Sequence, residues 1–224
     1  MTGAPIITVE HMRTGFGPAV LFEDLSFTVA RGEVFVILGG SGCGKSTLLK
    51  HLIGLYAPWK GSIDIAGMEL VTADEAQRLA ILRRIGVMYQ QGALFGSMNL
   101  MENVRLPLEE FTRLPDAAIE AVALAKLKLV GLDPITSAEL DELILELRRI
   151  LGITFVVVTH ELPSIFAIAD RVIMLDKETK GIIAEGAPAT LRDESTHPFV
   201  RKFFHRQAGD APAPAPIPTP APAA

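Results

Sequence analysis

Residues 37–47 read Ile37-Leu38-Gly39-Gly40-Ser41-Gly42-Cys43-Gly44-Lys45-Ser46-Thr47, and this stretch decides the fold of the 224-residue chain. It fits the pattern GxxxxGK followed by Ser or Thr. An apolar, strand-like run from Val34 to Leu38 precedes the glycines, and an apolar, helix-like run from Leu48 to Ile53 follows them. That context separates a phosphate-binding loop from an ordinary glycine-rich turn. We therefore expect the loop to bind a nucleoside triphosphate.

The residue types of this loop suit the chemistry of a polyphosphate. Glycines let successive backbone N–H groups curl around the phosphates, Lys45 supplies a positive charge at the terminal phosphates, and the Ser46 hydroxyl can ligate Mg²⁺. The candidate cofactor-binding residues are Gly39, Gly40, Ser41, Gly42, Cys43, Gly44, Lys45, Ser46 and Thr47.

Composition indicates one α/β domain in a reducing compartment. A 224-residue chain that is 49% hydrophobic can bury a full core. The formal net charge of −5, without any run rich in Lys and Arg, argues against nucleic acid as a partner. The single cysteine, Cys43, cannot form an intrachain disulfide, which suits the cytosol. The five histidines lack metal-ligand spacing, so we expect no structural metal.

The sequence shows neither a signal peptide nor a transmembrane helix. The beginning of the chain lacks a basic-then-apolar stretch, and the apolar run from Ile153 to Val158 is far shorter than the ~18 residues of a membrane span. We expect any membrane role to come through a partner.

Residue patterns predict antiparallel strands first and βα units afterwards. Strands are expected at 6–9, 25–29, 34–38, 62–66, 85–89, 153–159, 171–175 and 181–184. Helices are expected at 48–53, 73–84, 116–130 and 162–169, elsewhere within 99–151, and in two short C-terminal segments. One helix should begin at Asp133 and Pro134 and carry an apolar stripe made of Leu140, Leu143, Ile144, Leu147, Ile150 and Leu151.

Further motifs narrow the choice among proteins with a phosphate loop. Tyr89 to Phe95 (YQQGALF) follows an expected strand, Leu132-Asp133-Pro134 precedes an expected helix, Val157 to His160 (VVTH) ends a strand, and Phe16-Gly17 lies upstream. In this order the motifs resemble the ATP-binding subunit of an ABC transporter. More closely, the chain resembles the ATPase of Mla/Mce-type lipid transporters, above all in Gln91–Phe95 and Asp133–Thr136. A phosphate-loop kinase or GTPase is disfavoured, because the chain lacks an Asn-Lys-x-Asp guanine motif.

Carried over residue by residue, the resemblance assigns four further site residues. It implies that Phe16 stacks on adenine, that Gln90 approaches Mg²⁺ and the attacking water, and that His160 hydrogen-bonds the γ-phosphate. Asp133 is the aspartate that crosses the dimer interface, or a helix N-cap, and both roles can hold together. The alternatives are packing for Phe16, an ordinary strand end for Gln90 and a capping role for His160. The segment Gln91–Asn99 would line the groove that receives a permease helix.

The resemblance also implies an architecture and partners. The fold class is α/β: a P-loop NTPase with an ABC ATPase-like core around a parallel sheet, an N-terminal antiparallel β lobe and a truncated helical subdomain at 99–131. The ATP-binding domain covers residues 1–208, and a Pro/Ala-rich tail of disordered composition covers 209–224. The implied cofactors are ATP and Mg²⁺. The implied partners are an integral-membrane permease, a second copy of the chain and an MCE-type lipid-binding component, at the cytoplasmic face of the inner membrane.

Two elements that the family requires are missing. No Ser-Gly-Gly signature occurs between Gln90 and His160, and no apolar strand there ends in Asp-Glu. Val172–Asp176 resembles the ordinary strand that follows the switch helix, so we interpret it as a look-alike. Gly131-Leu132 fits both the end of the helical subdomain and the turn after the Asp-Glu strand. We therefore hypothesise an internal deletion between two short repeats, in the gene or in its gene model.

This deletion would remove the signature helix, the Walker B strand, an aspartate that supports Mg²⁺ and the glutamate general base. Losing a general base alone costs roughly 10²- to 10⁴-fold in rate. Binding of ATP could survive, but efficient hydrolysis should not. The alternatives are a nucleotide-binding pseudo-ATPase that regulates the permease and a non-functional deletion product. By resemblance the lost strand neighbours 153–159, so the sheet must close over the gap or expose an apolar edge.

Overall fold

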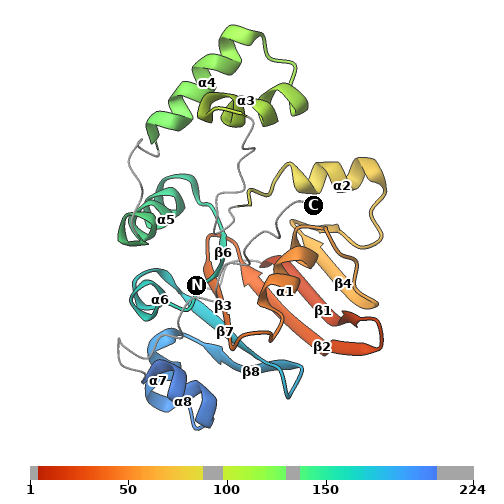
Figure 1. Cartoon of the computed structure of the whole chain (residues 1–224), viewed down its shortest axis with the longest axis vertical. Coiled ribbons are helices and arrows are strands. Elements are labelled where there is room, and N and C mark those ends of the chain that lie inside the picture. Colours follow the sequence, from red (N-terminus) through yellow and green to blue (C-terminus); the bar gives the residue numbers. More distant parts are fainter. Residues whose placement is uncertain (1–4, 88–97, 130–136, 206–224) are drawn as a thin grey trace, which may run out of the picture.

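The computed structural model describes residues 5–87, 98–129 and 137–205. Within these residues the chain forms two four-stranded sheets with helices around them (Figure 1). The expected combination of an antiparallel β lobe and a parallel core sheet is confirmed.

The first sheet is antiparallel and comes from the N-terminal part of the chain. Its strands are β1 (Pro5–Phe16), β2 (Ala19–Ala30), β4 (Lys60–Ile65) and β5 (Met68–Glu69), in the order β2-β1-β4-β5. Buried and exposed residues alternate through the second half of β2, which is typical of a strand with one face on a core. The turn between β1 and β2 contains Gly17, whose φ of 54° suits glycine.

The second sheet carries the phosphate loop. Its strands are β3 (Val34–Gly39), β6 (Phe155–Val158), β7 (Arg171–Asp176) and β8 (Gly181–Gly186), in the order β6-β3-β7-β8. Strands β6, β3 and β7 are parallel and β8 is antiparallel to β7. Five consecutive residues of β3 are buried, because helices and the first sheet cover both of its faces.

The described residues contain eight helices. They are α1 (Lys45–Leu52), α2 (Glu75–Leu82), α3 (Leu100–Phe111), α4 (Asp116–Leu129), α5 (Ser137–Leu151), α6 (Leu162–Ile168), α7 (Pro188–Glu194) and α8 (Pro198–Phe204). Of these, α3 and α4 pack on each other apart from the two sheets (Figure 1). Helix α3 begins with a capping box in which Asn99 and Glu102 exchange hydrogen bonds. None of these helices is long and apolar enough to cross a membrane.

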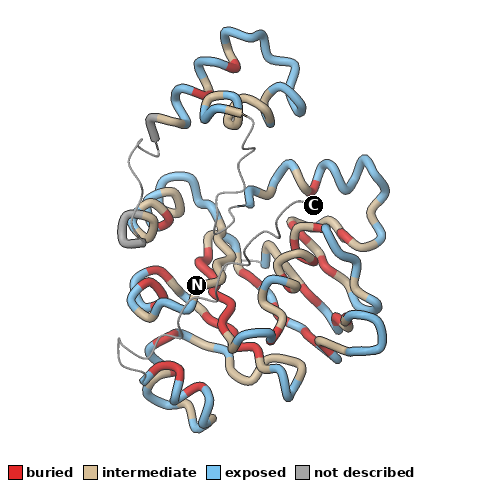
Figure 2. Tube along the Cα trace, in the orientation of Figure 1, coloured by how far each residue is buried: buried red, intermediate tan, exposed pale blue. Residues whose placement is uncertain are grey.

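Three hydrophobic clusters contain residues of β3, and the two largest pack helices against it. The larger cluster joins β1, β2 and β4 with α1 and one face of β3, so α1 lies between the two sheets. The smaller joins the other face of β3 and β7 with α6, α7 and α8. Figure 2 shows buried segments concentrated along β3 and β7, while α3 and α4 are largely exposed. The phosphate loop therefore emerges from the best-packed strand of the molecule.

The structure corrects three sequence-based expectations. The strand expected at 85–89 is absent at Ile85–Val87, and its last two residues lie outside the described part of the chain. In α5 the apolar stripe is only partly packed: Ile144 is buried, whereas Ile150 and Leu151 are 59% and 63% exposed. Ile153, expected at the start of the next strand, precedes β6 and is 37% exposed.

The surroundings of β6 account for the exposed end of α5. Strand β6 pairs with β3 on one side and, among the residues that the structure describes, with no strand on the other. All four residues of β6 are apolar and each is half-buried. A continuous apolar run is typical of a parallel strand that is covered on both faces of its sheet. The apolar residues that lead into β6 therefore lack a covering surface.

Candidate nucleotide-binding site

At several positions of the loop between β3 and α1, the backbone has a conformation that favours glycine. The φ angles are 145° at Gly39, 77° at Gly42 and 101° at Gly44. A Cβ placed on Gly39 would lie 2.5 Å from the carbonyl oxygen of Leu175. A Cβ on Gly44 would lie 2.6 Å from Cζ of Phe22. The loop is therefore held tightly against β7 and β2.

Lys45 directs its ammonium group into this loop. Its Nζ donates hydrogen bonds to the carbonyl oxygens of Gly39 and Gly40, at 2.8 and 2.9 Å. Lys45 is also the first residue of α1, whose first turn has no acidic residue and whose N-cap, Gly44, makes no side-chain cap. A helix N-terminus with these properties attracts an anion through its backbone N–H groups.

The structure places the predicted loop residues together between the end of β3 and the start of α1. Ser41, Gly42 and Ser46 are exposed, so a ligand can reach them, whereas Cys43 is buried. A Mg²⁺ ion would find the Ser46 hydroxyl here and would take its other ligands from phosphate and water. The described residues contain no group of three or more His, Cys, Asp or Glu side chains able to hold a metal by themselves. The exposed Ser46 hydroxyl fits a Mg²⁺ ion that a bound nucleotide carries.

The parallel register places His160 at the same sheet edge as the loop. Ile37 of β3 is paired with Val158 of β6, and two residues further on stand Gly39 and His160. His160 is exposed. Carboxyl ends of parallel strands are where α/β folds gather ligand-contacting groups. The backbone therefore brings His160 and the phosphate loop to one edge of the sheet, and the role of His160 at the γ-phosphate stays a prediction.

The look-alike aspartate, Asp176, is engaged in a turn. It ends β7, and its carboxylate accepts hydrogen bonds from the backbone N–H groups of Glu178 and Thr179, both at 3.0 Å. The bond from Thr179, opposed by slight burial, lowers the pKa of Asp176, and the other turn N–H groups add to the shift. These contacts match the interpretation of Val172–Asp176 as an ordinary strand followed by a turn.

Phe16 lies beside a hollow at the other end of α1. The ring is 57% exposed and meets Tyr56 edge-on, with 6.3 Å between ring centroids. The hollow measures about 480 Å³, within the range of small-ligand sites. Its lining residues include Phe16, Leu55, Tyr56 and Trp59, which are all at least 41% exposed. An aromatic surface on which a base could stack is therefore present.

Trp59 and Tyr56 line the hollow beside Phe16, although the sequence pattern did not indicate either as a candidate. The turn that contains them reads as a generic loop, and only their long-range contacts reveal them. Trp59 N–H donates to the carbonyl of Arg13, and its ring lies over Gly15, where a Cβ would come within 2.7 Å of Cη2. The only tryptophan of the chain thus lies next to Phe16.

His51 connects α1 to β1 beneath this hollow. Nδ1 lies 2.8 Å from the Thr47 carbonyl oxygen, so it carries the proton, and Nε2 lies 3.1 Å from the Thr14 hydroxyl and accepts from it. Burial lowers the pKa of His51, although the bond to Thr47 opposes that shift. The ring is therefore a neutral structural link, as a hydrogen-bonding histidine should be.

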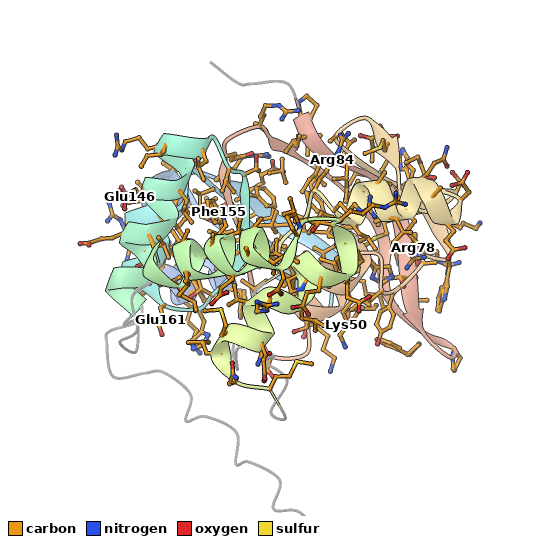
Figure 3. The ribbon with its side chains drawn as sticks, turned by 90° about the horizontal axis from the view of Figure 1, so that it is seen from above. Lys50, Arg78, Arg84, Glu146, Phe155 and Glu161 are labelled. Carbon is orange, nitrogen blue, oxygen red and sulfur yellow. The ribbon has the colours of Figure 1, made fainter. Side chains whose placement is uncertain are left out.

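Figure 3 shows from above which labelled residues lie toward α5 and which lie toward the first sheet. Phe155 of β6 and Glu161, next to His160, lie on the side of α5, whereas Lys50 of α1 and Arg78 lie on the side of the first sheet. The remaining predicted residues, Gln90 and Asp133, lie outside the described part of the chain.

Comparisons with known proteins agree on one family. A family model described as ABC transporter matches residues 22–151. The chain is 32% identical to the intermembrane phospholipid transport system ATP-binding protein MlaF of Escherichia coli (strain K12), covering 84% of each chain. It is 32% identical to the probable ribonucleotide transport ATP-binding protein mkl of Mycobacterium tuberculosis (strain H37Rv), covering 89% of this chain and 66% of that protein. It is 34% identical to the methionine import ATP-binding protein MetN of Brucella abortus, covering 84% and 61%.

Solved structures agree on the fold. A dimeric, post-hydrolysis structure of the ATP-binding cassette MJ0796 with ADP and Pi matches with a TM-score of 0.71 at 22% identity, covering 81% of this chain and 98% of that one. The structure of cbiO1 from Clostridium perfringens matches with a TM-score of 0.72 at 23% identity, covering 85% and 91%.

The alignments also contain positions that this chain does not fill. The one with MlaF runs over 229 positions, whereas 84% of 224 residues is about 188. The one with the M. tuberculosis protein runs over 240 positions, whereas 89% of 224 residues is about 199. In each, about 40 positions have no residue of this chain opposite them.

Proposed function

The chain belongs to the family of ABC transporter ATP-binding proteins, and from this membership we propose that it binds Mg-ATP as the nucleotide-binding subunit of a lipid transporter. Proteins of this family work as dimers with membrane permeases. The proposed domain is residues 1–208, with the tail at 209–224 outside it. The observation that carries ATP binding is the loop from Gly39 to Thr47, with Lys45 directed into it and α1 beginning at its end.

Each loop element would serve a part of the nucleotide. The N–H groups at the start of α1 and of the loop would bind the phosphates, and Lys45 would exchange its two carbonyl contacts for phosphate oxygens. Bound Mg²⁺ would neutralise phosphate charge, with Ser46 as its protein ligand and Gln90 beside it. His160 would approach the γ-phosphate, and Phe16 would support the base.

The lipid assignment rests on the resemblance of Gln91–Phe95 and Asp133–Thr136 to Mla/Mce-type ATPases, and on the relative MlaF. MetN is as similar in sequence, which makes methionine import the competing assignment. The proposed partners are a permease, a second copy of the chain and an MCE-type component, with the chain peripheral on the cytoplasmic face of the inner membrane.

Hydrolysis is proposed to be impaired. We assign the approximately 40 unfilled alignment positions to a gap between Leu132 and Asp133. Such a gap would contain the signature segment and the Asp-Glu strand. It agrees with the unpaired side of β6, because α5 leads into β6 and a strand that precedes α5 would lie next to β6 in a right-handed crossover.

Substitution of Lys45 tests ATP binding. Lys45→Ala deletes the charge that faces the phosphates, so most of the ATP affinity measured by calorimetry should disappear. Lys126→Ala, which removes an exposed lysine on α4, is the matched control and should bind like the parent. Equal ATP affinity in Lys45→Ala and the parent would refute the assignment.

Co-purification tests the lipid assignment. The chain should co-purify with an Mla-type permease in detergent and should not do so with a methionine-import permease. The reverse preference would transfer the proposal to amino-acid import.

A further inference from the structure

The C-terminal helix α8 reaches the phosphate loop through one aromatic ring. A Cβ placed on Gly40 would lie 3.6 Å from Cζ of Phe199, an ordinary van der Waals separation. Gly40 therefore has the edge of the Phe199 ring beside it. Since Phe199 follows Gly40 by more than 150 positions, only the tertiary fold creates this contact.

The helix that carries Phe199 is firmly anchored. Val200, Phe203 and Phe204 are buried at 0%, 8% and 4% exposure, and they pack in the cluster that contains Val36 and Leu38 of β3. Helix α8 and the phosphate loop are thus fixed to the same strand. The position of the Phe199 ring is set by this core rather than by the loop.

Two hydrogen bonds connect Gly40 with other residues of the loop. Its carbonyl oxygen accepts hydrogen bonds from Nζ of Lys45 at 2.9 Å and from the backbone N–H of Cys43 at 3.4 Å. Displacement of Gly40 would therefore disturb the ammonium group and the next turn of the loop together. Pre-organised donors bind more tightly than donors that must first be ordered.

We propose that Phe199 is a positioning residue for the phosphate loop: its ring restrains Gly40 and so keeps Lys45 and the loop N–H groups in a phosphate-binding arrangement. Its effect on nucleotide affinity rests on the proposed function, whereas the restraint of the loop does not. Phe199 itself does not touch the nucleotide in this role.

The chain offers a reporter and a matched control for this restraint. Cys43 is the only cysteine, lies inside the loop and is 2% exposed, so its reaction with a thiol reagent requires the loop to open. Phe166, on α6, is 40% exposed, similar to the 36% of Phe199. Its ring packs on Phe204 instead of the loop.

The experiment compares Phe199→Ala, Phe199→Leu and Phe166→Ala in the full chain. Phe199→Ala should make Cys43 react about five- to tenfold faster and weaken ATP binding by a similar factor. Phe199→Leu should restore most of both, and Phe166→Ala should match the parent. If Phe199→Ala destabilises the chain, Phe199→Leu and Phe199→Met replace it. The rate at which Cys43 reacts is then compared between these two variants below their melting temperatures.

Parental thiol rates in Phe199→Ala, or equal acceleration in Phe166→Ala, would overturn the inference. Failure of the proposed function gives a different result. In that case the parent binds no ATP, while the thiol rates still rank the variants by their restraint of the loop.

Discussion

At the scale of single residues, His51 makes the stability of the fold depend on pH. Its ring is buried, and burial lowers its pKa below the ordinary value of 6.5. As pH falls through 6.5 the unfolded chain takes up a proton before the folded chain does, so the free energy of unfolding should decrease. Above that pH this contribution is constant.

Urea denaturation at pH 7.5 and pH 5.5 measures this effect. The parent should lose more stability between these pH values than His51→Gln, in which the titrating ring is gone. His205→Gln, which removes an exposed histidine, should behave like the parent. Identical pH dependence in the parent and His51→Gln would show that the Thr14–His51 link does not control it.

Trp59 provides a direct optical test of the Phe16 assignment. Because the only tryptophan lines the same hollow as Phe16, a base that enters the hollow should change its fluorescence. Aromatic stacking on a base is worth about 1–3 kcal/mol. Phe16→Ala should therefore weaken ATP binding roughly tenfold and reduce the fluorescence change. Saturating ATP that leaves the emission of Trp59 unaltered would place the base elsewhere.

At the scale of elements, the end of α5 exposes apolar residues shortly before the chain enters β6. Ile150 and Leu151 are the most exposed large apolar residues in the described part of the chain, and β6 has an unpaired side there. Unpaired apolar edges favour association between chains. Ile150→Lys combined with Leu151→Lys should reduce light scattering on concentration without lowering the melting temperature, because neither side chain is buried.

A control variant separates this surface from general exposure. Leu124 of α4 is 43% exposed but lies away from β6, so Leu124→Lys should leave the scattering unchanged. If Leu124→Lys reduced scattering as much as the double variant does, the end of α5 would not be the surface through which the chains associate.

The sequence predicted elements best where local pattern decides. The run from β3 through the loop to α1 was predicted because continuous apolar residues, glycines and a lysine specify it within a short window. The strand expected at 85–89 failed within Ile85–Val87 because a strand needs a neighbour, and periodicity cannot tell whether one exists. The end of α5 is exposed for a similar reason, because β6 has one neighbouring strand among the described residues.

Of the candidate site, the phosphate loop is the part that local pattern predicts. Motif spacing predicts it at Gly39–Thr47, and the register of β3 with β6 brings His160 to the same edge of the sheet. Trp59 beside Phe16 and Phe199 beside Gly40 were not predictable, because both contacts join segments far apart in the chain through tertiary packing.

At the scale of the whole molecule, insertion of the missing segment tests the deletion. A family signature-to-Asp-Glu segment placed between Leu132 and Asp133 should raise ATP turnover by several orders of magnitude, since a general base and oriented charge each contribute about 10²-fold or more. It should also cover β6 and reduce scattering. A scrambled segment of equal length is the control, and equal turnover with both segments would contradict the deletion account.

We expect this chain to bind ATP without hydrolysing it efficiently. The most direct test measures equilibrium ATP binding and steady-state ATP hydrolysis on one preparation of the parent, with His160→Ala alongside. Binding should be saturable and hydrolysis near background. His160→Ala should change the hydrolysis rate little, because almost no activity remains to be lost. Hydrolysis at rates typical of the family, abolished by His160→Ala, would contradict this expectation. Asp176 or Glu178 would then have to carry the metal or the base.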